Sequence, residues 1–125
     1  TEIFELKPRQ FFENYARIYL QRSQDKEFLS FMRLIVGESG RFEYISDLFI
    51  SKIVAPSLNH IERYLNSTES LYFPNPAYTS RLLVGMLDSY IMTQEILGAS
   101  KQMEWQEASF IDMLVETLLS TAKIK

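Results

Sequence analysis

The chain has 125 residues, a length that suits one domain. Hydrophobic residues make up 46% and aromatic residues 14%, so the chain can bury a core and falls outside the disordered class. The formal net charge is −3, and an acidic domain binds phosphate backbones poorly because such binding needs clustered lysine and arginine. Cysteine is absent, which excludes disulfides and cysteine-based zinc sites and fits a cytoplasmic protein.

The sequence carries no membrane or export signal. Its longest apolar run, Leu82–Leu87, is far too short to span a bilayer. No basic region followed by an apolar region opens the chain, so no signal peptide is predicted. The chain starts at Thr1 rather than at methionine, and we expect it to be part of a longer protein.

Two amphipathic helices are predicted in the first third of the chain. Pro8 can occupy the first position of a helix over 8–21, where its missing N–H does no harm. Ser23 is expected to cap a second helix, and Gly40 to end it in the left-handed conformation. The apolar faces at helical spacing comprise Phe11, Phe12, Tyr15, Ile18 and Tyr19 in the first helix and Phe28, Phe31, Met32, Ile35 and Val36 in the second.

A third helix is predicted over 42–65, with a proline in its middle. Pro56 removes one backbone hydrogen bond and clashes with the preceding turn. The apolar stripe nevertheless stays in phase across the proline, from Ile50 to Ile61. We therefore expect a kinked helix or two nearly coaxial pieces rather than a domain boundary.

The segment 66–76 reads as a loop, and a fourth helix follows it. Asn75 is predicted to cap this helix, Pro76 to open it and Gly98 to terminate it. The chain as a whole is therefore predicted to be an all-α, single-domain bundle of about five helices over 1–125.

A fifth helix is expected from Ser100 through Trp105 to about Ala122. This helix and the fourth are apolar over more than half of their circumference, whereas a surface helix in a small monomer needs only one stripe roughly 100° wide. We predict that the second apolar side faces another copy of the chain across a two-fold interface; the alternative is a central helix in a monomer. The predicted interface residues are Leu82, Leu83, Trp105, Phe110, Met113, Leu114, Thr117 and Leu118.

The sequence offers no catalytic or metal-binding motif. His60 is its only histidine, and Ser57 occupies the position where a di-metal bundle needs glutamate. The zinc-protease, P-loop, nucleophile-elbow and dinucleotide-binding patterns are all missing. We expect no enzymatic activity, no metal and no cofactor.

Charged residues frame the end of the second helix. Glu38 lies five residues after Arg33 and three before Arg41, so a local charge network that fixes the turn is favoured. The alternative is that Arg33 points inward and meets a ligand carboxylate through two hydrogen bonds.

The supply of aromatic residues and methionine predicts a ligand site between the helices. Methionine packs adaptably, and tyrosine brings a hydroxyl that can orient a guest. Sites between helices are usually apolar with a few polar anchors, which favours a small hydrophobic or amphipathic effector. The candidate ligand-binding residues are Phe12, Tyr15, Tyr19, Met32, Arg33, Phe49, Ile53, Met86 and Tyr90.

The string Arg33–Phe42 reads R-L-x-x-x-E-x-x-R-F, and Pro56 and two terminal helices follow it. In this order the chain resembles the C-terminal domains of TetR-family transcriptional regulators over nearly its whole length. The resemblance implies that DNA is bound only through an N-terminal helix-turn-helix domain, which is missing from this chain. It also implies a homodimer in which the last two helices pack against their mates as a four-helix bundle.

The resemblance further implies an inducer held between the first four helices. Such an inducer would shift the balance between two spacings of the DNA-reading heads, and Pro56 is a plausible point at which the change is absorbed. The predicted function is therefore the effector-sensing and dimerisation domain of a TetR-like regulator, a repressor that responds to a small hydrophobic ligand. The alternative is a helical protein-interaction module with no small-molecule ligand.

Overall fold

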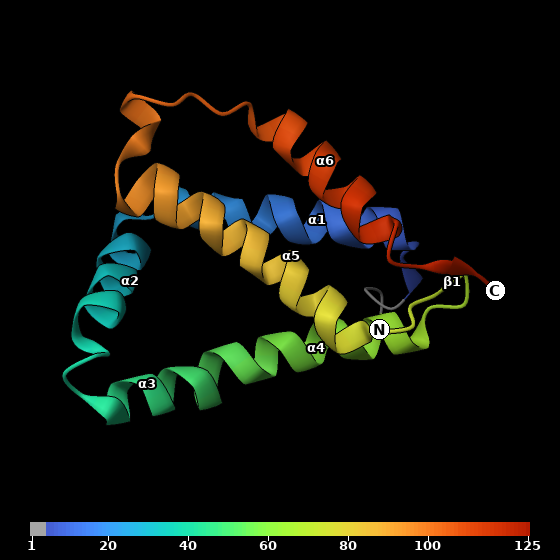
Figure 1. Cartoon of the computed structure of the whole chain (residues 1–125), viewed down its shortest axis with the longest axis horizontal. Helices are drawn as coiled ribbons and strands as arrows, with labels where there is room; N and C mark the ends of the chain where they lie inside the picture. The colour runs from blue at the N-terminus through green and yellow to red at the C-terminus, as the bar shows by residue number, and fades with distance from the viewer. Residues whose placement is uncertain (1–4) are drawn as a thin grey trace.

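The computed structural model describes residues 5–125, so the first four residues of the predicted 1–125 domain lie outside the described residues. Helices account for most of this part of the chain, which confirms the all-α prediction (Figure 1). The α-helices are α1 (Pro8–Gln21), α2 (Lys26–Glu38), α3 (Glu43–Phe49), α4 (Ala55–Ser67), α5 (Pro76–Ile91) and α6 (Glu107–Leu119). Two short strands, β1 (Leu71–Tyr72) and β2 (Lys123–Ile124), pair antiparallel.

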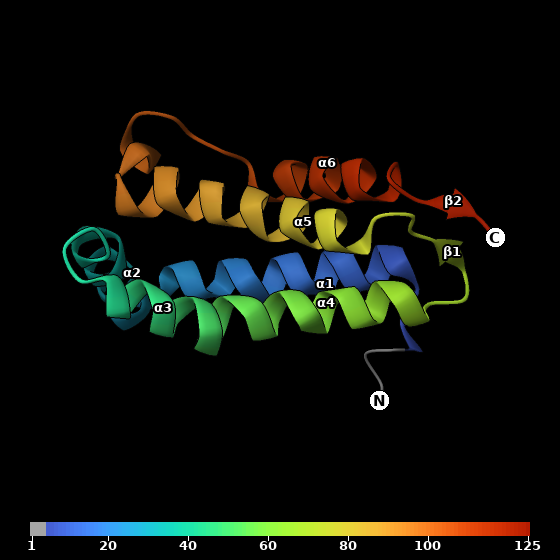
Figure 2. The same ribbon diagram turned by 60° about the horizontal axis from the view of Figure 1, so that its bottom comes forward.

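A π-helical turn over Ile50–Val54 joins α3 to α4, so 43–67 form one continuous rod. The amide of Ala55 donates to the carbonyl of Ile50, five residues back, immediately before Pro56. Because proline has no N–H and its ring needs room beside the preceding turn, the wider π turn relieves the clash. The two pieces are nearly coaxial, as expected from the sequence (Figure 2).

The helices form two layers. In Figure 2, α5 and α6 lie over α1 and α4, and α2 crosses one end of the bundle. The strands lie at the opposite end. Contacts between α4 and α5, α1 and α6, and α1 and α5 hold the layers together.

Apart from Phe73, which follows β1, the hydrophobic core comes from α1, α4, α5 and α6. The ring of Phe11 stacks on that of Tyr64, with 3.8 Å between centroids, and joins α1 to α4. No residue of α2, α3 or the π turn Ile50–Val54 is buried. The buried hydrophobic residues are Phe11, Phe12, Ala16, Leu20, Ile61, Tyr64, Leu65, Phe73, Leu83, Leu87, Ile91, Leu114, Val115 and Leu118.

The ends of α2 differ from the prediction. Asp25, not Ser23, caps the helix, because its carboxylate accepts from the amides of Glu27 and Phe28 at 2.9 and 3.4 Å. The Ser23 hydroxyl instead donates to the Leu20 carbonyl at 2.6 Å.

Helix α2 ends at Glu38, close to Gly40, but the left-handed conformation predicted for this glycine is wrong. Among the described residues, Gly98 alone has a positive φ, 76°, and it terminates the helical segment that follows α5 as predicted. At the end of α2, the amides of Arg41 and Phe42 both return to the Glu38 carbonyl at 3.0 Å. This right-handed turn needs no left-handed residue.

The last helix is shorter than predicted. It begins at Glu107, not Ser100, and a short 3-10 turn, Ala99–Lys101, stands where its start was expected. The buried Gln94 side chain donates to the Met103 carbonyl at 2.8 Å and so fastens the segment before α6 to the π turn Met92–Ile96 that follows α5. Pro8 and Pro76 stand at the starts of α1 and α5, as predicted. The side chain of Asn75, predicted to cap α5, makes no capping hydrogen bond.

Candidate ligand-binding site

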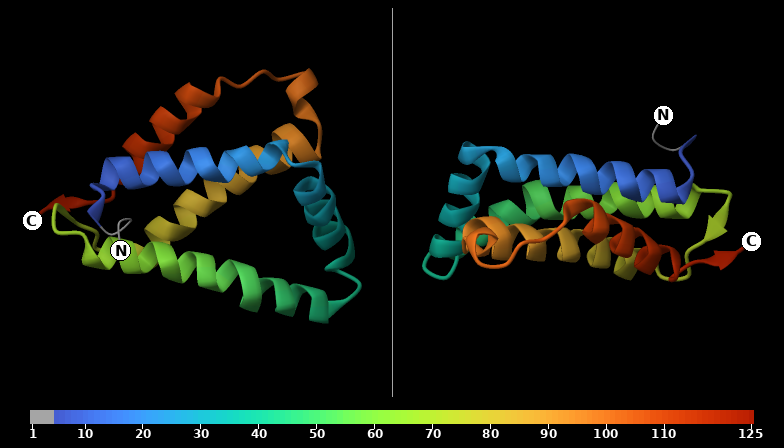
Figure 3. Two further views of the ribbon diagram at one scale, coloured as in Figure 1. Left: turned by 180° about the vertical axis from the view of Figure 1, so that it is seen from behind. Right: turned by 90° about the horizontal axis from the view of Figure 1, so that it is seen from above.

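A cavity of about 370 Å³ lies among α1, α2, the α3–α4 rod and α5. In Figure 3, left, α2 closes the side between the C-terminal end of α1 and the start of α3, with α5 crossing behind. The volume falls in the range of small-molecule sites. The cavity is lined by Tyr19, Arg22, Phe28, Phe31, Met32, Phe49, Ile53, Val54, Ser57, Val84 and Asp88.

Helix α2 supplies one aromatic wall of the cavity. Phe28, Phe31 and Met32 are spaced at i, i+3 and i+4, so they share one face of the helix. The ring of Phe31 lies 6.1 Å from that of Phe49 and connects this wall to α3. None of these side chains is fully buried, and of the four only Phe28 also packs against the core.

The π turn supplies the opposite wall. Ile53 and Val54, adjacent in sequence, both line the cavity, and Ser57 follows one turn later. The Ser57 hydroxyl donates to the Ile53 carbonyl at 2.8 Å, so its hydrogen-bonding capacity is partly met within the rod. π turns are frequent at functional sites.

One polar part of the cavity is a hydrogen-bonded pair formed between α1 and α5. The Tyr19 hydroxyl donates to the Asp88 carboxylate. Burial raises the pKa of Tyr19, and the charge of Asp88 raises it further. Burial also raises the pKa of Asp88 above its usual value, although the hydrogen bond from Tyr19 opposes this shift.

Asp88 is also part of a second hollow. A groove of about 650 Å³ runs between α4 and α5 and shares Val54, Val84 and Asp88 with the cavity. The Asp88 side chain is exposed to solvent through these two spaces, yet the protein around it removes enough water to shift its pKa. The carboxylate therefore stands at the boundary between the cavity and the α4–α5 groove.

Part of the predicted ligand-binding set lines this cavity: Tyr19, Met32, Phe49 and Ile53. Tyr15 lies one turn before Tyr19, with its ring 6.0 Å away, and is half-buried without lining the cavity. These side chains come from α1, α2, α3 and the π turn, so tertiary structure brings them together from four segments.

Phe12, Met86 and Tyr90 lie elsewhere. Phe12 is fully buried in the core, edge-on to Phe73, because α1 reaches the cavity only with its C-terminal turn. Met86 and Tyr90 lie on other faces of α5 than Val84 and Asp88. Tyr90 stacks on Phe110 at 5.1 Å, on the side of α5 that faces α6.

Arg33 does not reach the cavity either. It follows Met32, and one residue turns a helix by roughly 100°, so Arg33 faces away. Its guanidinium donates to the Glu95 carbonyl at 3.2 Å, which ties α2 to the π turn Met92–Ile96. The predicted charge network is reduced to a Glu38–Arg41 ion pair at 3.7 Å.

Sequence reasoning missed several lining residues, of which Asp88 carried the clearest signal. It is the single acidic residue of α5, within an otherwise apolar run that ends at Ile91. A lone carboxylate in such a helix needs a partner or a site. The other missed residues are Arg22, Phe28, Phe31, Val54, Ser57 and Val84.

Three residues of the predicted dimer interface are core residues. Leu83, Leu114 and Leu118 are fully buried within one chain and have no surface to offer a partner. Both last helices were expected to have a spare apolar side, but these leucines fill the space among α1, α5 and α6.

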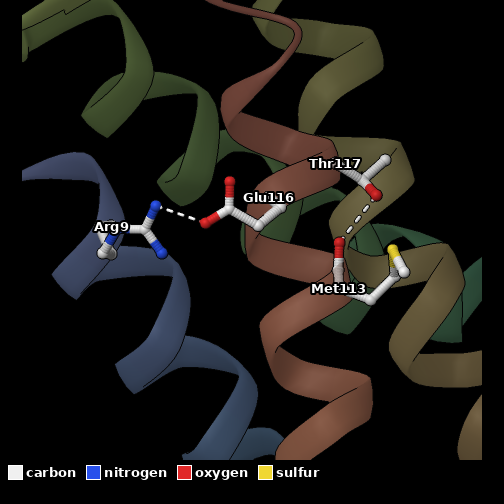
Figure 4. Close-up of polar contacts among 4 residues, drawn as sticks. All are labelled: Arg9, Met113, Glu116 and Thr117. Carbon is white, nitrogen blue, oxygen red and sulfur yellow. Dashed lines mark hydrogen bonds and ion pairs between the residues drawn. The ribbon is translucent and has the colours of Figure 1, made fainter.

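The remaining interface candidates keep accessible surface. Met113 is 66% exposed and Leu82 44% exposed. Figure 4 shows Met113 and Thr117 on the side of α6 away from α1, whereas Glu116 points to α1 and pairs with Arg9 at 2.5 Å. The Thr117 hydroxyl donates to the Met113 carbonyl at 2.7 Å, so this outer face has little unmet hydrogen bonding.

The aromatic candidates form a cluster beside α5. The Trp105 ring lies 4.9 Å from that of Phe110 and 5.4 Å from that of Tyr90. Trp105 remains exposed and Phe110 is half-buried. This cluster continues the outer face of α6 toward the loop before it.

The fold is an all-helical domain with a cavity between its helices. The family model for the C-terminal domain of AefR-like transcriptional repressors, a TetR-type domain, matches residues 10–121. The chain belongs to this family, which confirms the resemblance seen in the sequence. No curated protein and no solved structure matches the chain. Within residues 5–125, no helix combines the length and apolar character needed to cross a bilayer.

Proposed function

We propose that the chain is the effector-sensing and dimerisation domain of a TetR-like transcriptional repressor, with a small hydrophobic or amphipathic effector in the cavity. The observation that carries this proposal is the apolar cavity of about 370 Å³ beside helices that have no buried residue of their own. A ligand there would give α2 and the α3–α4 rod apolar contacts that the chain itself does not supply. We expect no catalysis, no cofactor and a cytoplasmic location.

DNA would be contacted only by a separate N-terminal domain. An effector can shift the balance between two arrangements only by its differential affinity for them, a coupling of about 1–3 kcal/mol. The rod contributes Phe49, Ile53 and Ser57 to the cavity, so a bound effector would act directly on it. Pro56 and the π turn before it are the proposed point of adjustment, because helical continuity is weakest there.

The proposed homodimer would use the outer faces of α5 and α6. Leu82 and Met113 provide exposed apolar surface, with Thr117, Trp105 and Phe110 beside them. Two copies packed in this way would form a four-helix bundle around a two-fold axis.

The second candidate function is a helical protein-interaction module. It is favoured by a specific feature, the exposed apolar side chains that α2 and α3 present outside the cavity. Leu34, Tyr44 and Leu48 are all largely accessible. A partner protein could cover this surface in place of a small-molecule effector.

Fluorescence of the neutral probe N-phenyl-1-naphthylamine tests the effector site. We expect the probe to brighten on binding the chain, and Val84→Phe, which fills the cavity, to reduce binding at least tenfold. Val36→Phe, on an exposed part of α2 outside the cavity, is the matched control and should bind as the unaltered chain does. Equal binding by both variants, with unchanged circular dichroism, would exclude the cavity as the site.

A further inference from the structure

We propose that the cavity selects amphipathic cations, with an apolar tail among the aromatic walls and a positively charged head group against Asp88. This inference rests on the proposed function, because it takes the cavity as the effector site and adds the chemical class of the effector. The class meant is an aliphatic or arylalkyl amine, which is protonated at neutral pH.

The first support is the position of Asp88. It is the one acidic residue among the side chains that line the cavity, and it stands where the cavity meets the α4–α5 groove. A ligand that extends from one space into the other would pass the carboxylate. The remaining walls are mostly apolar, so Asp88 is the natural attachment point for a charged head group.

The second support is the lack of a cationic partner for Asp88. Within residues 5–125 the ion pairs are Arg9–Glu116 and Arg41–Glu38, and neither includes Asp88. Its hydrogen-bond partner is the neutral hydroxyl of Tyr19. Burial has raised the pKa of the carboxyl, so the charged form is partly desolvated and gains more from an ammonium ion than a fully hydrated carboxylate does.

The third support is the aromatic character of the walls. Phe28, Phe31, Phe49 and Tyr19 line the same cavity as the carboxylate, and aromatic faces attract cations. The Tyr19 ring makes a cation–π contact with Arg22, whose guanidinium carbon lies 5.8 Å from the ring centroid.

Two arginines could instead favour an anion. Arg22 lines the cavity and Arg81 lines the α4–α5 groove. Both side chains are exposed, so their charges are hydrated and screened by solvent. An anionic head group in the cavity would also lie near the Asp88 carboxylate and be repelled by it. The cation is therefore the better fit.

Calorimetric titration with octylamine, 1-octanol and octanoate tests this selectivity with one tail and three head groups. We expect octylamine to bind at least tenfold more tightly than 1-octanol, and octanoate to bind most weakly. Asp88→Asn should lower octylamine affinity to that of 1-octanol and leave 1-octanol binding unchanged. Asp47→Asn, on an exposed part of α3 outside the cavity, is the matched control and should keep the preference.

A second variant tests the same idea without removing the charge. Tyr19→Phe keeps the ring and deletes the hydroxyl that competes for Asp88, so the preference for octylamine over 1-octanol should increase. Circular dichroism would confirm that both variants fold.

The possible failures are distinct. If 1-octanol binds as tightly as octylamine, or Asp88→Asn leaves octylamine binding intact, the selectivity is wrong while the effector cavity stands. Tightest binding by octanoate would point to Arg22 and overturn the inference in the same way. If neither these ligands nor the neutral naphthylamine probe binds, the effector cavity itself is refuted together with its selectivity.

Discussion

The two ends of this bundle are built differently. The packed end, as we call it, comprises α1, α5, α6 and the C-terminal part of α4, which together with Phe73 supply the buried hydrophobic residues of 5–125. At the other end, α2, α3 and the π turn have no buried residue and surround the cavity. Burial therefore stabilises the fold mainly at the packed end, and α2, α3 and the π turn Ile50–Val54, which we call the open end, are the part that the proposed effector would reorganise.

The largest expected effect is a loss of stability caused by a substitution in the packed end. Leu87→Ala removes a fully buried side chain and should lower the free energy of unfolding by about 2–5 kcal/mol. Leu48→Ala, at a position that is 54% exposed on α3, should change it by about 0.5 kcal/mol. Urea unfolding followed by circular dichroism measures both variants, and equal losses would contradict the division into two ends.

The next prediction separates the proposed dimer interface from the open end. Met113→Glu places a charge on the outer face of α6 and should raise the dimer dissociation constant at least tenfold, about 1.4 kcal/mol. Leu34→Glu places the same charge on α2 and should leave the dimer intact. Sedimentation velocity over a concentration series reports the constants. An unaltered chain that stays monomeric throughout would rule out the interface.

A smaller effect tests whether the open end unfolds by itself. Asp25→Ala removes the cap of α2 and should weaken that helix by about 1 kcal/mol. Hydrogen exchange should accelerate in α2 and remain slow in the packed segments around Ala16 and Leu114. Uniform acceleration over the whole chain would show that the two ends unfold as one unit.

The smallest effect concerns Asp88. Its pKa is raised in the folded chain, so its contribution to stability is present below the unfolded pKa and is lost as pH rises through the folded pKa. Asp88→Asn should therefore melt at the same or a higher temperature than the unaltered chain at pH 7. The melting temperature of the unaltered chain should rise relative to that of the variant as pH falls through the folded pKa of Asp88. Melting curves at a series of pH values measure this, and the reverse trend would mean that the Tyr19 hydrogen bond outweighs desolvation.

The positions of the helices followed from local chemistry. Apolar residues at spacings of three and four, Pro8 and Pro76 at helix starts and Gly98 at a helix end act within a few residues of themselves. The rod through Pro56 was predictable for the same reason, because the apolar stripe continues across it. The helix before Glu107 was overpredicted, because the hydrogen bond from Gln94 to Met103 depends on how the chain folds back.

The sequence by itself determined the helical class, the family and the apolar face of each helix, because periodicity and the Arg33–Phe42 string are local properties. Only the tertiary structure decided which residue on a face meets the core, the cavity or solvent. Leu83 and Leu82 are neighbours, yet one is buried and the other exposed, and Arg33 turns away where Met32 lines the cavity. The physical reason is that a rotation of roughly 100° per residue separates such neighbours, and the packing of other helices fixes which side is covered.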